Sequence, residues 1–397
     1  MSEWHEVLLG DVVTLQRGFD LPARARIDGP VPIVSSSGVT GWHAVAKADP
    51  PGVVIGRYGS LGSVHWIMEP YWPLNTSLWV KDFKGNDPRY VSYLLKTVSM
   101  DGSAASAVPG VNRNHLHRLP VLVPAVGSQM RIAKVLATFD ELIEINERRI
   151  ELLEELVRSL YREWFVRFRF PGHEDIVVVN SSVGPVPTGW ELTSLGCMAT
   201  WLSGGTPSTK NEAFWGGGIP WITSGTLTTL LLNESPRTLT SAGVAAGSRL
   251  VERDTLLFVV RGMSLVREFR VGIADRTLAF GQDCKALVAA DGVDPLFLAF
   301  TVLDRQHDIQ GMVELAGHGT GKLATDRLKS IVLPLPSESI QTRFVEAVRP
   351  IRELISVVQA SSKQIAAIRD LLLPRLVTGR LDISDIDLGD LLPLEVA

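Results

Sequence analysis

Hydrophobic residues recur at helical spacing in two long stretches of the chain. In the first stretch the steps between them alternate between four and three residues once Asn146 is counted, at Phe139, Ile143, Ile150, Leu153, Val157, Leu160 and Trp164. This alternation is typical of the contact line of a coiled coil, because it keeps these residues on one side of a helix. The pattern predicts a helix from about Ser128 to Phe168.

The second stretch follows the same pattern less strictly and predicts a helix from about Ser339 to Thr378. Ser362 and Arg369 interrupt its contact line. We expect Pro350 to start a segment or to make a kink, because proline lacks the backbone N–H that a helix interior needs. The apolar positions are Ile351, Ile355, Val358, Ile365 and Leu372.

Asn146 in the first contact line has two interpretations. A buried polar residue there lowers stability but fixes the register or the partner of the helix. Alternatively, Asn146 lies at a hydrated edge. A helix of about 40 residues is ~60 Å long, so two such helices packed together would hold other domains apart.

The chain also contains an internal repeat. Four sets of residues recur in the same order in both halves, and the separation between matched residues grows until the helices, where it becomes constant. The second half therefore carries insertions before its helix, and we infer a duplication. The matches are Trp4 and Leu9-Gly10 with Trp190 and Leu195-Gly196, Gly18 with Gly204, Asp87-Pro88 with Asp294-Pro295, and Pro124 and Gln129 with Pro336 and Gln341.

Outside the helices, each half is rich in Gly, Ser, Thr, Trp and β-branched residues, which predicts short strands between turns. The expected fold class is α+β: two β-rich domains separated by two long helices that form an antiparallel coiled coil, with a pseudo-two-fold internal repeat. The expected boundaries are 1–126 and 190–337 for the β-rich domains, 127–170 and 338–380 for the helices, 171–189 for a linker, and 381–397 for an acidic tail.

The charge balance at first argues against a nucleic-acid-binding protein. The 397 residues include 39 basic and 43 acidic ones, a net charge of −4, whereas such proteins are usually basic. The tail from Asp382 onward carries acids and no base, however, and the rest of the chain is close to neutral. Arg accounts for 29 of the basic residues and suits guanine edges and phosphates, although a GC-rich genome is the simpler explanation.

Composition excludes several other classes. At 45% hydrophobic and 21% charged residues the chain is ordinary globular protein. Its two cysteines provide no disulfide framework and no cysteine-rich metal site. The first residues lack a signal-peptide pattern and no apolar run approaches membrane-spanning length, so we expect a cytoplasmic protein without a membrane partner.

Motifs for catalysis are incomplete. Residues 317–323 resemble a phosphate-binding loop, but Ala316 and Leu323 replace the required glycine and hydroxyl. Residues 49–52 (DPPG) lack the aromatic residue of adenine methyltransferases and are better explained as a turn. His115 and His117 have no nearby acids or cysteines to complete a metal site, so a surface or DNA-facing role fits them better. We therefore expect no catalysis by this chain alone.

Several loops in both halves combine small polar residues with Arg, amide or aromatic side chains. Arg, Asn and Gln can form the paired hydrogen bonds that distinguish bases in the major groove, and Ser and Thr suit phosphates. An ordinary solvated turn is the simpler interpretation of any single loop, so the hypothesis of DNA binding depends on recurrence in both halves. The candidates are Arg17, Ser36, Ser37, Arg57, Tyr58, Ser60, Asn75, Arg113, Asn114, Ser203, Thr206, Ser224, Arg261, Arg267, Arg270, Gln282, His318 and Lys322.

The order of these motifs resembles, over nearly the whole chain, the specificity subunit of bacterial type I restriction–modification systems. Individually the motifs are loose, but their order, duplication and spacing are specific. They are WHEVLLG at 4–10, LPVLVP at 119–124, LYREWFVRF at 160–168, FPG at 170–172, GPVPTGW at 184–190, IVLPLP at 331–336 and LLLPRLVTGRLD at 371–382.

This resemblance implies a non-catalytic subunit that reads double-stranded DNA. Each β-rich domain would be a target-recognition domain for one half of a split, asymmetric site, and the coiled coil would set the gap. The helices would dock two methyltransferase subunits, which bind S-adenosylmethionine and flip the target adenine. Restriction subunits that use ATP and Mg²⁺ would join them, so this chain itself would hold no cofactor and no metal.

Two other classes remain as alternatives. A coiled-coil adaptor whose β-rich domains bind proteins or glycans would suit the 10 Trp residues and the acidic balance. A standalone methyltransferase or nuclease would need the cofactor and metal motifs that are missing.

Overall fold

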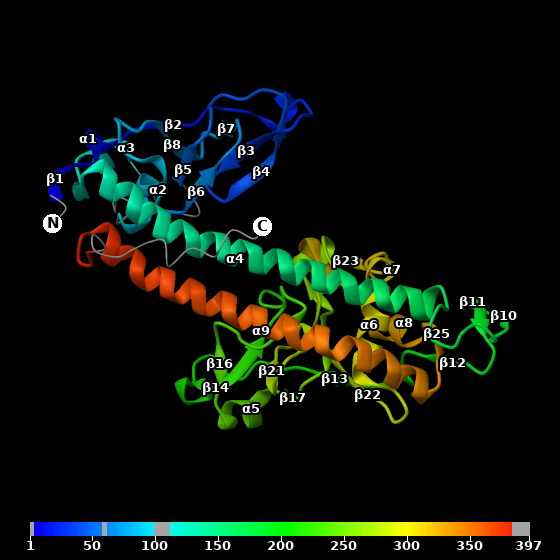
Figure 1. Ribbon diagram of the computed structural model, residues 1–397. Coiled ribbons are helices and arrows are strands. Elements are labelled where there is room, and N and C mark those ends of the chain that lie inside the picture. The colour runs from blue at the N-terminus through cyan, green and yellow to red at the C-terminus, as the bar shows by residue number, and fades with distance from the viewer. Residues whose placement is uncertain (1–3, 58–61, 99–111, 383–397) are drawn as a thin grey trace. The chain divides into compact units, whose positions relative to one another are not determined.

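The computed structural model describes residues 4–57, 62–98 and 112–382, with the side chain of residue 318 excepted. The candidates Tyr58 and Ser60 and most of the acidic tail lie outside these ranges. The chain divides into two units, one formed by residues 1–145 and 361–397 and the other by residues 146–360. Figure 1 shows the β-rich part of each unit and the two long helices, α4 (Val126–Tyr161) and α9 (Glu338–Val377).

Unit 1 contains a four-stranded, a three-stranded and a two-stranded sheet, in the orders β2-β8-β5-β6, β4-β3-β7 and β1-β9. Two short helices, α1 and α3, accompany β1 and β9, and α2 follows β8. The bounds are β1 Trp4–Leu8, α1 Leu9–Val12, β2 Thr14–Arg17, η1 Ala23–Ala25, β3 Val31–Ser35, β4 Gly38–His43, β5 Gly52–Gly56, β6 Val64–Ile67, β7 Trp72–Pro73, β8 Ser77–Asp82, α2 Pro88–Thr97, α3 Arg113–His117 and β9 Pro120–Pro124.

Unit 2 repeats these sheets with additions, in the orders β13-β22-β18-β20-β15, β16-β14-β21-β17, β12-β25 and β19-β24-β23. Helix α6 corresponds to α2 and α8 to α3. The bounds are β12 Glu191–Ser194, β13 Ala199–Ser203, η3 Glu212–Phe214, β14 Trp215–Ile222, β15 Leu231–Leu232, β16 Thr238–Leu239, α5 Ser241–Gly247, β17 Leu250–Val251, β18 Leu256–Val259, β19 Arg261–Gly262, η4 Ser264–Val266, β20 Val271–Ala274, β21 Leu278–Phe280, β22 Cys284–Ala289, α6 Pro295–Asp304, α7 Gln306–Gln310, β23 Glu314–Ala316, η5 Gly317–Gly319, β24 Thr320–Lys322, α8 Thr325–Lys329 and β25 Val332–Leu335.

The matching strand orders confirm the predicted duplication. Without β15, the order β13-β22-β18-β20 in unit 2 matches β2-β8-β5-β6 in unit 1, and without β17, the order β16-β14-β21 matches β4-β3-β7. The second sheet of each unit contains a parallel pair at the same place, β3 with β7 and β14 with β21. The strands β15 and β17 and helix α5 are insertions that the described residues of unit 1 lack. The α+β class, with two β-rich parts and two long helices, is likewise confirmed.

A buried glutamine makes the same hydrogen bonds in both units. In unit 1 the Gln129 side chain accepts from the Asp87 backbone N at 3.0 Å and donates to the Pro124 carbonyl at 3.0 Å. In unit 2 Gln341 accepts from Asp294 N at 2.8 Å and donates to the Pro336 carbonyl at 2.9 Å. The aspartates in turn cap α2 and α6, so one amide fastens the start of a long helix to its own β-rich part.

Each unit builds its core on segments of both long helices. In unit 1 the core includes Ile132, Ala133 and Leu136 of α4 and Leu373, Leu376 and Val377 of α9. In unit 2 it includes Val157 and Tyr161 of α4 and Phe344, Val345, Val348 and Ile355 of α9. Helix α4 leads from unit 1 into unit 2 and α9 leads back, so the two helices run in opposite directions.

Every residue of the two predicted contact lines is buried or half-buried, Asn146 included at 7% exposure. Arg369, which we expected to weaken the second line, forms an ion pair with Asp140 of α4 at 2.8 Å. The same Asp140 pairs with Arg89 of α2 at 2.9 Å and accepts from the Tyr93 hydroxyl at 2.6 Å. The polar interruption is therefore a contact that joins both helices to the β-rich part of unit 1.

Three expectations about segment ends need correction. Helix α4 ends at Tyr161 and passes into a π-helical turn, η2 (Arg162–Val166), and Phe168 takes a positive φ of 59°, which a helix cannot continue. Helix α9 runs through Pro350 without a break, so Pro350 does not start a separate segment. The segment 171–189 is more than a linker, because it contains a hairpin of β10 (Val178–Ser181) and β11 (Gly184–Pro187).

Candidate nucleic-acid interface

Backbone hydrogen bonds gather four loops of unit 1 into one cluster, the unit 1 loop cluster (residues 17–20, 34–37, 57 and 73–77). Phe19 N donates to the Pro73 carbonyl at 2.8 Å, and Leu74 N donates to the Val34 carbonyl at 2.8 Å. Arg57 N, at the end of β5, donates to the Thr76 carbonyl at 3.2 Å. Gly18 lies so close to Leu74 that an added Cβ would stand 2.2 Å from its carbonyl oxygen, so glycine is required there.

Unit 2 holds the corresponding loops with the same hydrogen bonds, and these form the unit 2 loop cluster (residues 203–206, 222–226, 260–267 and 280–284). Gly205 N donates to the Phe280 carbonyl at 3.0 Å, and Gly281 N to the Ile222 carbonyl at 2.8 Å. Val260 N donates to the Asp283 carbonyl at 2.9 Å, and Arg261 N donates to the same oxygen at 3.3 Å. Gly204 has the same crowding as Gly18, with an added Cβ 2.3 Å from the Gly281 oxygen.

These bonds show which predicted contacts correspond to each other. The bond from Arg57 N to the Thr76 carbonyl corresponds to the bond from Val260 N to the Asp283 carbonyl, so Arg57 matches Val260 in the strand register and Arg261 follows one residue later in the same loop. Counting from these bonds also matches Ser36 with Ser224 and Asn75 with Gln282. Each unit thus places an arginine, an amide and a hydroxyl residue in equivalent loops, which the sequence had identified only as separate turns.

Among the unit 1 candidates, some fasten the cluster and others face solvent. Ser36 is 5% exposed, and its hydroxyl donates to the Thr76 carbonyl and accepts from Arg57 N. Arg17 and Ser37 are exposed. Arg17 donates to the Asn75 carbonyl at 3.4 Å, and the Asn75 amide donates to Asp20. Ser36 is therefore a structural residue, whereas Arg17 and Ser37 are available to a ligand.

Arg113 and Asn114 are exposed on α3, which contacts α1 and β2. His117, on the same helix, accepts a hydrogen bond from Leu15 N at 2.9 Å and crowds Gly10. Burial lowers the pKa of His117, and the charges of Lys84 and Arg113 lower it further. The partly buried ring of His117 therefore fastens α3 to β2.

In unit 2 the cationic candidates gather at one edge of the loop cluster. Arg261 and Lys322 are cross-strand partners in β19 and β24, and both are exposed, as are Arg267 and Gln282. Among the described residues, no hydrogen bond or ion pair engages the side chains of Arg261, Arg267 or Lys322. Ser203 and Thr206 are also exposed, and Ser203 accepts from Lys285. For His318 only the backbone is described, in η5.

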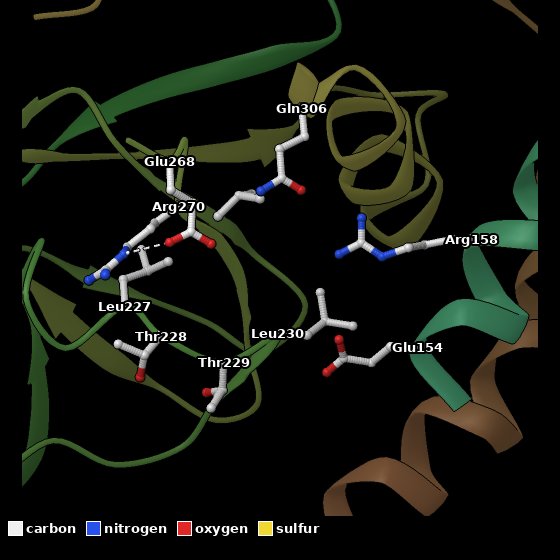
Figure 2. A pocket seen from close by; sticks show the side chains of 10 residues that line it. Glu154, Arg158, Leu227, Thr228, Thr229, Leu230, Glu268, Arg270 and Gln306 are labelled. Carbon is white, nitrogen blue, oxygen red and sulfur yellow. Dashed lines mark hydrogen bonds and ion pairs between the residues drawn. The ribbon is translucent and has the colours of Figure 1, made fainter. Parts of the chain in front are cut away.

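Arg270 differs from Arg261 and Arg267 because its side chain is engaged within the unit. Its Nη1 donates to the Ser224 carbonyl at 3.4 Å, and its Nε pairs with Glu268 at 3.2 Å. Figure 2 shows both residues beside a hollow of about 210 Å³, with Arg158 and Glu154 on α4 across from them. Burial raises the pKa of Glu154. Arg270 thus positions the loop that carries Ser224.

Arg237, a further exposed cationic residue of unit 2, was not identified from the sequence. Arg237 is exposed and stacks on Trp215 with its guanidinium carbon 3.6 Å from the ring centre. Trp215 is fixed by a hydrogen bond from its Nε1 to the Ser208 carbonyl at 3.1 Å. The residues are far apart in sequence, and only the pairing of β14 with β16 brings them together, so no local signal predicts the contact.

The described residues include no group of three or more His, Cys, Asp or Glu side chains that could hold a metal ion. Cys284 is fully buried, and burial, with a smaller contribution from Asp283, raises its pKa to about 12. Residues 317–322 form η5 and β24 instead of the loop-to-helix turn that cradles phosphate. Within the described part of the chain, none of the helices is apolar over a length that would cross a membrane.

Comparison with known proteins identifies a family that this chain matches. The model of the family described as "Type I restriction modification DNA specificity domain" matches residues 1–155 and 187–367. Two relatives are the MjaIX specificity subunit of a type I restriction enzyme from Methanocaldococcus jannaschii, 25% identical over 75% of this chain and 70% of its own, and the EcoR124I/EcoR124II specificity subunit from Escherichia coli, 27% identical over 39% of each chain.

A solved structure is also similar to this chain. The S subunit of a type I restriction–modification system from M. genitalium aligns over 94% of this chain and 96% of its own, with a TM-score of 0.56 and 16% identity. At that identity the likeness concerns the fold.

Proposed function

The chain belongs to the type I restriction–modification DNA specificity family, and we propose that it reads the DNA sequence for such a complex. Unit 1 reads one half of a bipartite site and unit 2 the other. The observation that carries the proposal is the pair of loop clusters, because the same backbone bonds hold different side chains. Asn75 in one cluster stands where Gln282 stands in the other, so the two half-sites differ and the whole site is asymmetric.

The roles of single residues follow from their exposure. Arg17, Arg261, Arg267 and Lys322 have exposed cationic side chains in or beside the clusters, which suits guanine edges and phosphates. Ser36 and Arg270 hold loops in place and act through them. The glycines at 18 and 204 allow the loops to approach closely.

Exposed apolar residues on the long helices support docking of partner subunits. In unit 1 they include Ile145, Ile368 and Leu371, between 47% and 55% exposed. In unit 2 Leu152, Leu156, Leu354 and Val357 are between 47% and 63% exposed. They lie outside the buried contact lines, and each unit has its own set, which suits two methyltransferase subunits, one per unit.

Chemistry belongs to the partners in this proposal. The methyltransferase subunits bind S-adenosylmethionine and modify adenine, and restriction subunits use ATP and Mg²⁺. This chain supplies sequence recognition, without a cofactor of its own.

The test is methylation of a randomised DNA library by this chain purified with its methyltransferase partner. We expect methylated molecules to share two fixed half-sites with a gap of constant length. Methylation without a bipartite consensus would contradict the proposal. Binding should also weaken steeply with salt, because phosphate contacts release counterions, whereas an adaptor for proteins or glycans would bind its ligand independently of salt.

A further inference from the structure

One loop sequence recurs in both units with different residues at its centre. After β5, unit 1 continues Arg57-Tyr58-Gly59-Ser60-Leu61, and after β18 and Val260, unit 2 continues Arg261-Gly262-Met263-Ser264-Leu265. The Arg, Ser and Leu are common to both sequences. Each loop begins at an equivalent backbone hydrogen bond, from Arg57 N to the Thr76 carbonyl in unit 1 and from Val260 N to the Asp283 carbonyl in unit 2. Between the shared Arg and Ser the two sequences differ, and such a difference lets two domains of one origin acquire different ligand preferences.

In unit 2 the variable centre is Met263. Its side chain is 75% exposed, the largest fraction among the large apolar side chains that the structure describes. Gly262 precedes it with a φ of +148°, and Leu265, which follows in η4, is fully buried. The Met263 carbonyl accepts from Val266 N at 3.3 Å. The buried Leu265 side chain and the backbone hydrogen bond thus fix the loop, and the Met263 side chain is exposed to solvent.

The surroundings of Met263 are cationic. Arg261 lies two residues before it and Arg267 four residues after it, and Lys322 is the cross-strand partner of Arg261. All three are exposed. A ligand that complements this arrangement carries negative charge on its flanks and an apolar group at its centre. A DNA groove has phosphates along both walls, and the C5 methyl of thymine is the apolar group on the base edges of the major groove.

We propose that Met263 contacts a thymine C5 methyl group in the major groove and so determines one base of the half-site read by unit 2. This contact rests on the proposed function, since it assumes that unit 2 reads DNA. The paired strands β19 and β24 present the loop, and a two-stranded ribbon fits the major groove. Methionine offers no strong hydrogen-bonding group, so it favours a T·A pair through the methyl group alone.

The experiment removes the methyl group from the DNA and the side chain from the protein. The full chain, purified with its methyltransferase partner, is titrated with duplexes in which each thymine of the half-site is replaced in turn by uracil. For the wild-type chain, one uracil should weaken binding about fourfold, the effect of one buried methyl group. Met263→Ala should bind the thymine duplex more weakly and respond no further to uracil at that position.

Two controls separate this contact from loss of structure. Met263→Leu retains an apolar side chain and should keep most of the uracil response. Met68→Ala removes a methionine that is 67% exposed in unit 1 and should leave the uracil response of the unit 2 half-site unchanged.

Three results would overturn the proposal: a half-site without thymine, a wild-type chain that responds to no uracil, or a Met263→Ala chain that keeps the response. A wild-type complex without any sequence preference would contradict the proposed function as well. The failure of the single contact is thereby distinguishable from the failure of DNA reading.

Discussion

At the scale of residues, Gln129 and Gln341 are the clearest products of the duplication. Each is 2% exposed and satisfies an N–H at a helix start and a carbonyl at a strand end. The sequence placed them at matching positions after Pro124 and Pro336, but periodicity alone does not tell a buried amide from a surface one. Their role depends on the folded structure, which brings the strand end and the capping aspartate within hydrogen-bonding distance of the glutamine.

Replacing Gln341 by alanine should therefore destabilise unit 2. The change leaves Asp294 N and the Pro336 carbonyl without their partner in a buried place, which costs about 1–3 kcal/mol for each group. We expect a loss of at least about 2 kcal/mol in the free energy of unfolding, measured by urea denaturation. Gln364→Ala, on an exposed position of α9, is the matched control, and equal stability of the two variants would refute this account.

Replacing Arg261 by alanine should affect one half-site only. If the guanidinium reads a guanine edge, the variant loses about 1–3 kcal/mol of discrimination at one position of the half-site read by unit 2, while the other half-site is unchanged. The methylation consensus of the variant complex measures this. An equal loss on all DNA sequences would instead assign Arg261 to a phosphate.

At the scale of elements, Asp140 joins three helices of unit 1. Burial acts to raise the pKa of Asp140, but hydrogen bonds from Tyr93 and Arg369 and the charges of Lys96 and Arg89 outweigh it, so the pKa is lower than usual. Its matched position in the repeat, Arg352 of α9, carries the opposite charge and pairs with Asp254 at 2.9 Å and Asp275 at 2.8 Å. Each helix start therefore fits its own β-rich part.

This geometry predicts a pH dependence. Because the pKa of Asp140 is lower in the folded chain, its contribution to stability is fully present above the ordinary aspartate pKa of about 4 and is lost as the pH falls through the folded value. Asp140→Asn should therefore have a lower free energy of unfolding than the wild-type chain near neutral pH. On acidification, the free energy of unfolding of the variant should decrease less than that of the wild-type chain. Unfolding curves at several pH values would show this, and an unchanged acid slope would contradict the assignment.

The two long helices carry a second prediction at this scale. In unit 1 the Asp140–Arg369 ion pair defines their register, so one heptad can be removed from α4 after Asp140 and another from α9 before Arg369. Such a deletion shortens each helix by about 10 Å, the length of about three base pairs. If the helices set the gap, the methylated site should keep both half-sites and lose about three base pairs between them. Altered half-sites would contradict this model.

At the scale of the whole molecule, the sequence predicted the repeat, the α+β class and the approximate helix ranges. These depend on periodicity and on ordered matches such as Trp4 with Trp190, which survive divergence. It did not predict that Ser36 is internal, that His117 fastens α3, or that Arg270 supports a loop. Those roles depend on contacts between loops that are distant in sequence. The same type of side chain can either hold two loops together or face solvent, so the residue type alone does not predict its role.

The net charge of the whole chain does not describe the charge of the loop clusters. The value of −4 includes the acids from Asp382 onward, while exposed cations gather in the unit 2 loop cluster. We expect the isolated chain to bind DNA weakly and to depend on partner subunits to hold the duplex, since phosphate contacts supply most of the affinity.

Mapping of methylated adenine across the genome of the host tests the central claim most directly. The account predicts a methylated motif of two different half-sites with a fixed gap, which disappears when the gene for this chain is deleted and the methyltransferase gene is retained. A methylation pattern that persists without the chain, or a motif that is contiguous, would contradict it.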